Sequence, residues 1–528
     1  MEGNENNKLV KGALLLTLAG LIGKVLSAGY RIPLQNLTGD IGFYIYQQVY
    51  SFLAIALILS LYGFPSAISK MINELKAQGS GPTFKHFYLP IFLLLSFICG
   101  TIFLFLFFNA KEIAVWVGDP NLQKMYEYAA FAFLLIPFSS LLRGVSQGML
   151  QMKPTAYSQI SEQMVRVFLI ISAAVFIYVQ SEDIYMIGQA AALASIFGAI
   201  AAILILGFFF MKRKPVSHNS YDIPWSYYVK TLLTLGVVAA LNHMVLIIIQ
   251  FADTFTLVPS LMEYGLSQLD AMQAKGIFDR GQPLIQLGTV LGSSFALALI
   301  PTISREKLNK DPTVFYVYIQ SALVFSFYLA IGATLGLILI FPEANTLLYQ
   351  NGKGTFSLQI LVIAIFLSSI AITAASILQG LGYIKRTAGF IMVAFFIKWI
   401  GNQVLVPFFG ITGSAAATVF SLAVLAILML VALKRKLPSL QVERQINWRA
   451  LVVAAGGMTV YLAAVDYLVG DIESRLVLLL YVIFISITGA CIYTLLLLRF
   501  KAFTEKELSM LPFASLLIRI HKEREKNV

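Results

Sequence analysis

The sequence is poor in charged, cysteine and histidine residues, and each shortage excludes a class of protein. Only 12% of its 528 residues are charged, whereas soluble domains carry about 25%. Both cysteines, Cys99 and Cys491, fall within long apolar runs, so neither a disulfide framework nor a thiolate metal site is expected. The four histidines are too few and too scattered for a zinc site. We therefore expect no metal and no cofactor, with coupling to sodium or protons left open.

Apolar residues, by contrast, make up 59% of the chain. Runs of about 20 apolar residues, the length that crosses a hydrocarbon core about 30 Å thick, recur from end to end. They predict an all-α polytopic membrane protein with about fourteen transmembrane helices. The predicted spans lie near 9–33, 43–64, 87–109, 126–150, 157–180, 184–211, 229–257, 282–303, 314–342, 357–381, 385–409, 411–433, 449–470 and 474–499.

The net charge of +12 is distributed unevenly between the predicted loops. The basic loops lie at 70–85, 212–214, 305–310, 385–386 and 434–436. The loops between them carry acidic residues instead, such as Glu182 and Asp183. Because Lys and Arg favour cytoplasmic loops, both termini are predicted to be cytoplasmic. Membrane lipids rather than nucleic acid are the expected partners of these basic loops.

The two halves of the sequence resemble each other. Residues Gln147-Gly148, Lys153, Thr155, Ala156 and Arg166 recur at one constant offset as Gln379-Gly380, Lys385, Thr387, Ala388 and Lys398. The small-residue runs 188–192 and 413–417 are also alike, and such runs let helices pack closely. We predict two six-span lobes, then two further spans, then an amphipathic tail on the cytoplasmic membrane surface. These parts are 1–228, 229–448, 449–500 and 501–528.

Charged residues within the predicted spans mark the candidate site, because a charge inside a bilayer costs at least a few kcal/mol. They are Lys24, Arg31, Arg143, Glu162, Arg166, Asp253, Asp279, Arg280 and Lys398. Basic residues outnumber acidic ones, so a cavity that they line is cationic and suits an anionic ligand. The planar guanidinium of Arg matches the oxygens of a diphosphate.

Structural roles compete with binding at several of these positions. Glu162 and Arg166 are four residues apart on one helix face and can neutralise each other. Arg31, Arg143 and Arg280 lie near the ends of their spans, where long side chains can extend to the membrane surface.

A cation could also drive the cycle. Asp253 has no obvious local partner, and Asn402 and Thr418 offer oxygen ligands of the kind that sodium uses. Lys398, one turn before Asn402, could instead supply a tethered positive charge. A polar cluster that holds helices together is the alternative.

One stretch of the sequence resembles a known family. It reads Leu142-Arg143-Gly144-x-x-Gln147-Gly148, then Met152-x-Pro154-x-Ala156-x-Ser158-Gln159-x-x-Glu162-Gln163-x-Val165-Arg166. With the segment Gly63-Phe64-Pro65-x-Ala67-Ile68-Ser69-Lys70, the repeat and the fourteen spans, it is similar to SpoVB-type polysaccharide-biosynthesis proteins. These belong to the multidrug/oligosaccharidyl-lipid/polysaccharide exporter superfamily, which also includes the MurJ lipid II flippases.

The resemblance implies two six-helix lobes around a central cavity that opens alternately to each side of a bacterial cytoplasmic membrane. It implies an undecaprenyl-diphosphate-linked saccharide as substrate, with residues 449–499 forming a groove for the lipid tail. In MurJ-type members, basic residues of the first span and an Asp-Arg pair opening the eighth are functional. Lys24, Arg31 and Asp279-Arg280 occupy similar places, although Lys24 stands where an Arg is usual.

Two other functions fit less well. A cation-coupled multidrug exporter of the same superfamily usually needs only twelve helices and places acids where cationic drugs bind. A membrane glycosyltransferase or ligase needs catalytic acids or a histidine in a sizeable outer loop, and the predicted outer loops are short. We therefore expect a flippase and not an enzyme.

Overall fold

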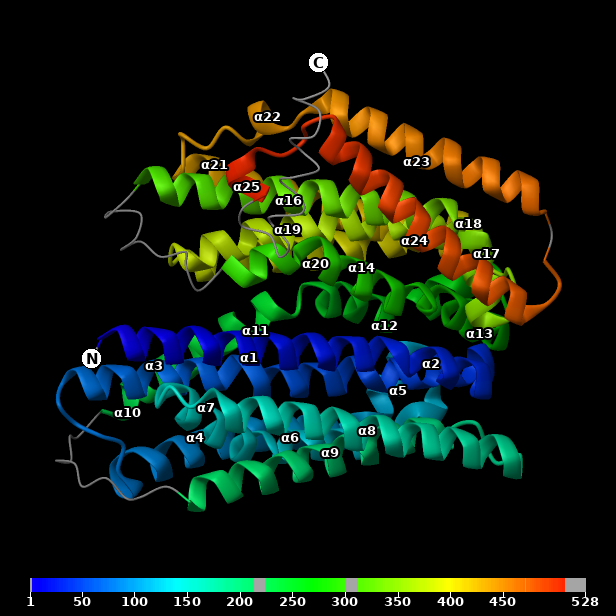
Figure 1. Cartoon of the computed structure of the whole chain (residues 1–528). Helices are drawn as coiled ribbons and strands as arrows, with labels where there is room; N and C mark the ends of the chain where they lie inside the picture. The colour runs from blue at the N-terminus through cyan, green and yellow to red at the C-terminus, as the bar shows by residue number, and fades with distance from the viewer. Residues whose placement is uncertain (1, 213–223, 300–311, 471, 509–528) are drawn as a thin grey trace. The chain divides into compact units, whose positions relative to one another are not determined.

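The chain folds almost entirely into helices. The computed structural model describes residues 2–212, 224–299, 312–470 and 472–508, and every regular element within them is helical (Figure 1). Twelve helical stretches of these residues are long and apolar enough to cross a membrane, and one of them, Leu18–Ala77, holds two predicted spans. The all-α polytopic fold is therefore confirmed. The predicted surface tail from 509 onward and the basic residues 213–214 and 305–310 lie outside the described residues.

The helices form two compact units. The first, Met1–Pro283 with Tyr383–Ser421, holds α1 (Glu2–Gly29), α2 (Arg31–Ile58), η1 (Leu59–Gly63), α3 (Phe64–Ala77), η2 (Phe84–Tyr88), α4 (Leu89–Phe108), α5 (Ala110–Val117), η3 (Pro120–Leu122), α6 (Gln123–Leu134), α7 (Ile136–Gly148), α8 (Met152–Gln180), α9 (Met186–Met211), α10 (Trp225–Thr231), η4 (Leu232–Gly236), α11 (Val237–His243), α12 (Val245–Glu263), α13 (Gln268–Asp279), α20 (Ile384–Phe409) and the start of α21 (Ile411–Lys436). The second, Leu284–Gly382 with Leu422–Val528, holds most of α14 (Gly281–Leu299), then α16 (Pro312–Leu339), α17 (Phe341–Tyr349), α18 (Thr355–Val362), α19 (Ala364–Gly380), the rest of α21, α22 (Val442–Gln445), α23 (Trp448–Val469), α24 (Arg475–Arg499) and α25 (Glu505–Leu508). The predicted lobes 1–228 and 229–448 follow the sequence repeat and stay a prediction.

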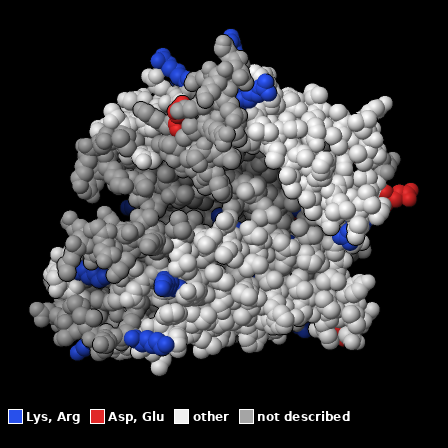
Figure 2. All heavy atoms as spheres, in the orientation of Figure 1, with Lys and Arg blue, Asp and Glu red and all other residues white. Residues whose placement is uncertain are grey.

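The polarity of the molecule is inverted relative to a water-soluble protein. Large apolar side chains such as Phe97 (74% exposed), Phe168 (69%) and Leu204 (68%) point outward from α4, α8 and α9. Uncharged residues cover most of the described surface in Figure 2, and the Lys and Arg side chains over the first unit gather toward the end at which α1 begins. An apolar exterior of this kind is stable in lipid, so the chain is a multi-pass membrane protein.

A sharp turn at Gly39 folds α2 back on itself. Gly39 has a φ of +68°, and the Arg31 guanidinium lies 4.2 Å from the centroid of the Tyr50 ring. In a straight helix these two residues would be about 28 Å apart, at 1.5 Å per residue. Residues 31–38 therefore continue the direction of α1, and the chain after Gly39 runs back beside them as a second span.

The motif residues after Arg143 explain how α7 packs against α3. A Cβ added to Gly144 would lie 2.6 Å from Ile68 Cβ, and one added to Gly148 would lie 2.8 Å from Ile72 Cβ. Glycines four residues apart thus let the two helices approach closely, as small residues do between membrane helices. Lys76 Nζ then donates to the Gly148 carbonyl at 3.0 Å.

In the second unit, α23 and α24 pack side by side and against α16 (Figure 1). The Tyr493 hydroxyl donates to the Tyr328 carbonyl at 2.9 Å, and the Asn447 backbone N–H donates to the Tyr328 hydroxyl at 2.8 Å. These bonds anchor the last two predicted spans to the rest of their unit.

Candidate functional site

Seven charged side chains of the first unit form one buried group, called the charged cluster below. Its members are Arg31, Asp40, Asp253, Lys275, Asp279, Arg280 and Lys398. Three ion pairs neutralise six of them: Lys398–Asp253 (2.7 Å), Lys275–Asp279 (2.7 Å) and Arg280–Asp40 (2.5 Å). Asp279 also interacts electrostatically with Arg31 and Asp253, which links two of the pairs with Arg31, and Arg280 of the third pair is the sequence neighbour of Asp279. Arg31 has no acidic partner in the cluster, so the cluster carries one excess positive charge.

Arg31 is the unusual member of this cluster. Its side chain is 0% exposed, and none of its three guanidinium nitrogens has a hydrogen-bond partner among the described residues. Its guanidinium instead stacks over the Tyr50 ring, beside the contact between the Tyr30 and Tyr46 hydroxyls. The alternative that Arg31 extends to the membrane surface is wrong, because the tyrosines of the returning α2 segment enclose it. A buried guanidinium whose nitrogens make no geometric hydrogen bond with the described residues has the donor chemistry that an anion would need.

Arg280 holds the tip of the α2 hairpin. Its Nε donates to Asp40 Oδ1 at 2.8 Å, and Gln35 donates to the same oxygen at 2.9 Å. Arg280 is 0% exposed, so the alternative that it extends to the membrane surface is also wrong. Although Asp279 is its neighbour in sequence, the two side chains take separate partners, because adjacent helical residues point apart.

Gly276 allows α13 to reach this hairpin, and its substitution gives a first test. A Cβ at Gly276 would lie 2.0 Å from the Asp40 carbonyl oxygen, a backbone atom that cannot rotate away. We expect Gly276→Ala to lower the free energy of unfolding by about 1–3 kcal/mol, as overpacking does. Denaturant titration in mixed micelles measures this free energy of unfolding. Gly389→Ala on α20, where a Cβ meets nothing within 4 Å, is the control and should be neutral. Equal stability of both variants would contradict the close approach.

Asp253 contacts two of the three residues that the sequence analysis grouped with it, Lys398 and Asn402. Lys398 Nζ lies 2.7 Å from Asp253 Oδ1, and the Asn402 amide donates to the same oxygen at 2.7 Å. Ser414, which the sequence did not single out, donates to it at 3.1 Å. Thr418 is not part of this group, since its hydroxyl donates to the Ser414 carbonyl at 3.0 Å.

Arg143, Glu162 and Arg166 form a second buried group in the first unit. Glu162 pairs with Arg143 at 2.7 Å and with Arg166 at 3.4 Å, which confirms the predicted i,i+4 pair. Arg143 also donates to the hydroxyls of Ser158 and Ser60, at 3.2 and 3.0 Å. The alternative that Arg143 extends to the membrane surface is wrong, because it is 0% exposed and fully engaged. Four hydrogen-bonding contacts to Arg143 make this group a brace between η1, α7 and α8.

Lys24 stands apart from both groups. Its side chain on α1 is exposed, and it makes no ion pair with a described residue.

Asp40 and Lys275 are the charged residues that sequence reasoning missed. A signal existed for each: Asp40 lies in the short turn between the first two spans, and Lys275 precedes Asp279 by one helical turn.

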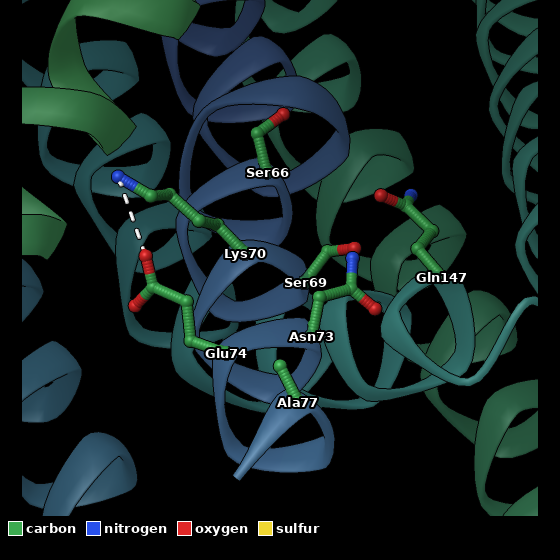
Figure 3. A pocket seen from close by; sticks show the side chains of 7 residues that line it. All are labelled: Ser66, Ser69, Lys70, Asn73, Glu74, Ala77 and Gln147. Carbon is green, nitrogen blue, oxygen red and sulfur yellow. Dashed lines mark ion pairs between the residues drawn. The ribbon is translucent and has the colours of Figure 1, made fainter.

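A polar surface pocket of about 540 Å³ lies between α3 and α7 (Figure 3). Its lining residues are Ser66, Ser69, Lys70, Asn73, Glu74, Ala77 and Gln147. Its one cation, Lys70, lies 3.7 Å from Glu74, as the dashed line in Figure 3 marks. This pair cancels the charge of the pocket, whereas Arg31 has no ion-pair partner among the described residues.

The chain is similar to several known proteins. The model of a family described as "Polysaccharide biosynthesis protein" matches residues 9–307. The uncharacterized membrane protein YabM of Bacillus subtilis (strain 168) is 38% identical, over 99% of each chain. The lipid II flippase MurJ of that strain is 25% identical, over 78% of this chain and 80% of its own length. A solved structure of lipid II flippase MurJ, in an inward closed conformation, shares the fold, with a TM-score of 0.65 and 13% identity over 91% of this chain and 98% of that chain.

Proposed function

Because the chain belongs to the polysaccharide biosynthesis protein family, we propose that it is a flippase for an undecaprenyl-diphosphate-linked saccharide. It would carry this precursor from the cytoplasmic to the outer leaflet of the bacterial cytoplasmic membrane, with both chain termini in the cytoplasm. One relative and one solved structure of the same fold are named lipid II flippases.

The unpaired guanidinium of Arg31 is the observation that carries the proposal. Burying a charge without a partner costs several kcal/mol, so a sequence that keeps one gains something from it elsewhere. A diphosphate supplies the missing negative charge and enough oxygens for several guanidinium donors. The saccharide would extend into the polar interior, and the isoprenoid chain would remain in the bilayer.

Arg280 would couple this binding to a change of conformation. Its partner Asp40 belongs to the first predicted lobe and Arg280 to the second, so their ion pair would hold the predicted lobes together at the hairpin tip. A phosphate oxygen competes with the Asp40 carboxylate for the same guanidinium. Transfer of Arg280 from Asp40 to the substrate would loosen this tie, and rocking of the lobes could then expose the headgroup on the other side.

The lipid tail would run along α23 and α24, the two helices that follow the predicted lobes. Their outward residues are large and apolar, for example Val460 (70% exposed), Leu480 (61%) and Ile487 (58%). Such a surface is compatible with an isoprenoid chain lying along it in the bilayer.

Leaflet-to-leaflet movement in proteoliposomes tests the function. Purified wild type should flip an undecaprenyl-diphosphate sugar, and Arg280→Ala should abolish flipping while the protein still folds. Arg435→Ala, at the exposed end of α21, is the matched control and should flip as wild type does. Normal flipping by Arg280→Ala would refute the role of Arg280. No flipping by wild type, together with uptake of a cationic dye, would favour a multidrug exporter.

A further inference from the structure

Four oxygen atoms surround the Lys398 ammonium within the membrane-spanning helices of the first unit. Lys398 Nζ lies 2.7 Å from Asp253 Oδ1, 2.9 Å from Asn402 Oδ1, and 2.8 and 2.9 Å from the Ser414 hydroxyl and carbonyl oxygens. All four residues are at most 2% exposed. These oxygens are called the cage below.

Three helices meet closely enough to build the cage. Lys398 and Asn402 are one turn apart on α20, and Asp253 faces them from α12. Gly413 brings the start of α21 against α20, since a Cβ there would lie 2.4 Å from the Leu405 carbonyl oxygen. That approach places the Ser414 backbone carbonyl within reach of Lys398, which a larger residue at 413 would prevent.

The oxygens of the cage are oriented by hydrogen bonds that do not involve Lys398. The Asn402 amide nitrogen donates to Asp253 Oδ1 and to the Thr256 hydroxyl, both at 2.7 Å, which turns its carbonyl oxygen toward the cage. The Ser414 hydroxyl donates to Asp253 at 3.1 Å, which leaves its lone pairs for a cation. The cage should therefore persist when the lysine side chain is removed.

The chemistry of the cage is that of a monovalent-cation site. All of its contacting atoms are oxygens, they bear one negative charge in total, and they outnumber the three N–H donors of an ammonium. Asp253 Oδ2 has no hydrogen-bond partner among the described residues, so the carboxylate depends on the cation for its neutralisation.

We propose that the cage is a site for a monovalent cation that Lys398 fills with its own ammonium. A tethered cation then takes the place of a dissolved sodium ion in the conformational cycle. The role of this site in transport rests on the proposed flippase function, whereas the occupancy of the cage by Lys398 does not. In the wild type, sodium should therefore have no specific effect at this site.

Removal of the lysine side chain tests this proposal without any transport assay. The apparent melting temperature of purified Lys398→Ala is compared in sodium chloride and in choline chloride of equal ionic strength. We expect sodium to raise it by about 2–4 °C, because sodium binds only the folded cage. Methylammonium, which replaces the missing charge, should act in the same direction. Wild type and the double variant Asp253→Asn/Lys398→Ala, whose cage carries no charge, should show no difference between the two salts.

Two results would overturn the proposal. One is a Lys398→Ala protein that melts equally in both salts, or that is unfolded in both, because its cage then accepts no external cation. The other is a wild type that sodium stabilises and an Asp253→Asn variant that it does not, because the site then binds sodium beside the lysine. Neither result depends on whether the wild type flips lipid, so failure of the cage proposal can be distinguished from failure of the proposed function.

Discussion

Arg31→Met is expected to slow transport by about 100-fold without destabilising the protein. Replacing buried charge by an apolar side chain of similar volume often gains about 1–4 kcal/mol. The cation–π contact with the Tyr50 ring, which the variant loses, stabilises the wild type by only about 0.5–2 kcal/mol. The apparent melting temperature of the variant should therefore rise or hold. Loss of a buried charge pair with the diphosphate should slow flipping by about 100-fold. Thermal melts and proteoliposome assays on one preparation measure both effects.

Arg31→Lys is the matched variant for this prediction. It keeps the charge but lacks the planar fork of donors, so flipping should be partly retained. A destabilised Arg31→Met, or one that flips at the wild-type rate, would show that Arg31 serves the fold and not an anionic ligand.

Glu162→Ala should cause the largest loss of stability. It leaves Arg143 and Arg166 buried at 0% and 4% exposure with no acidic partner in their group. Breaking a buried pair in this way typically costs about 3–5 kcal/mol. We expect Glu162→Ala to yield little folded protein, and denaturant titration in mixed micelles to show a correspondingly lower free energy of unfolding.

Glu443→Ala provides the comparison for Glu162→Ala. Its ion pair with Lys434 is solvent-exposed at 3.2 Å, and such pairs contribute little. No measurable change in stability is therefore expected there. If Glu162→Ala were as stable as wild type but failed to flip lipid, the Arg143–Glu162–Arg166 group would belong to the substrate site and not to the brace.

The helices were predictable from the sequence because lipid imposes both a length and a composition on every span. Local spacing also identified the Glu162–Arg166 pair, since residues four apart share a helix face. The motif glycines Gly144 and Gly148 indicated close packing in the same way, and the structure shows Ile68 and Ile72 against them.

The pairing of the buried charges was not predictable, because it depends on how distant segments pack. Asp40 and Arg280 are 240 residues apart in the chain, and Asp253 and Asn402 are 149 apart. Sequence reasoning could name Arg280 and Asp253 as costly charges but could not say that each has a partner. It also could not separate Arg31 from them, since only the ion pairs among the described residues show which cation of the charged cluster has none.

Binding of the lipid to purified protein tests the central claim most directly, namely that Arg31 receives the diphosphate. The melting temperature of wild type and of Arg31→Met is recorded with undecaprenyl-diphosphate sugar and with undecaprenol, which lacks the phosphates. We expect only the diphosphate lipid to stabilise the wild type, and we expect Arg31→Met to lose this response while it remains folded. Equal stabilisation of both proteins by the diphosphate lipid, or equal effects of the two lipids on the wild type, would contradict it.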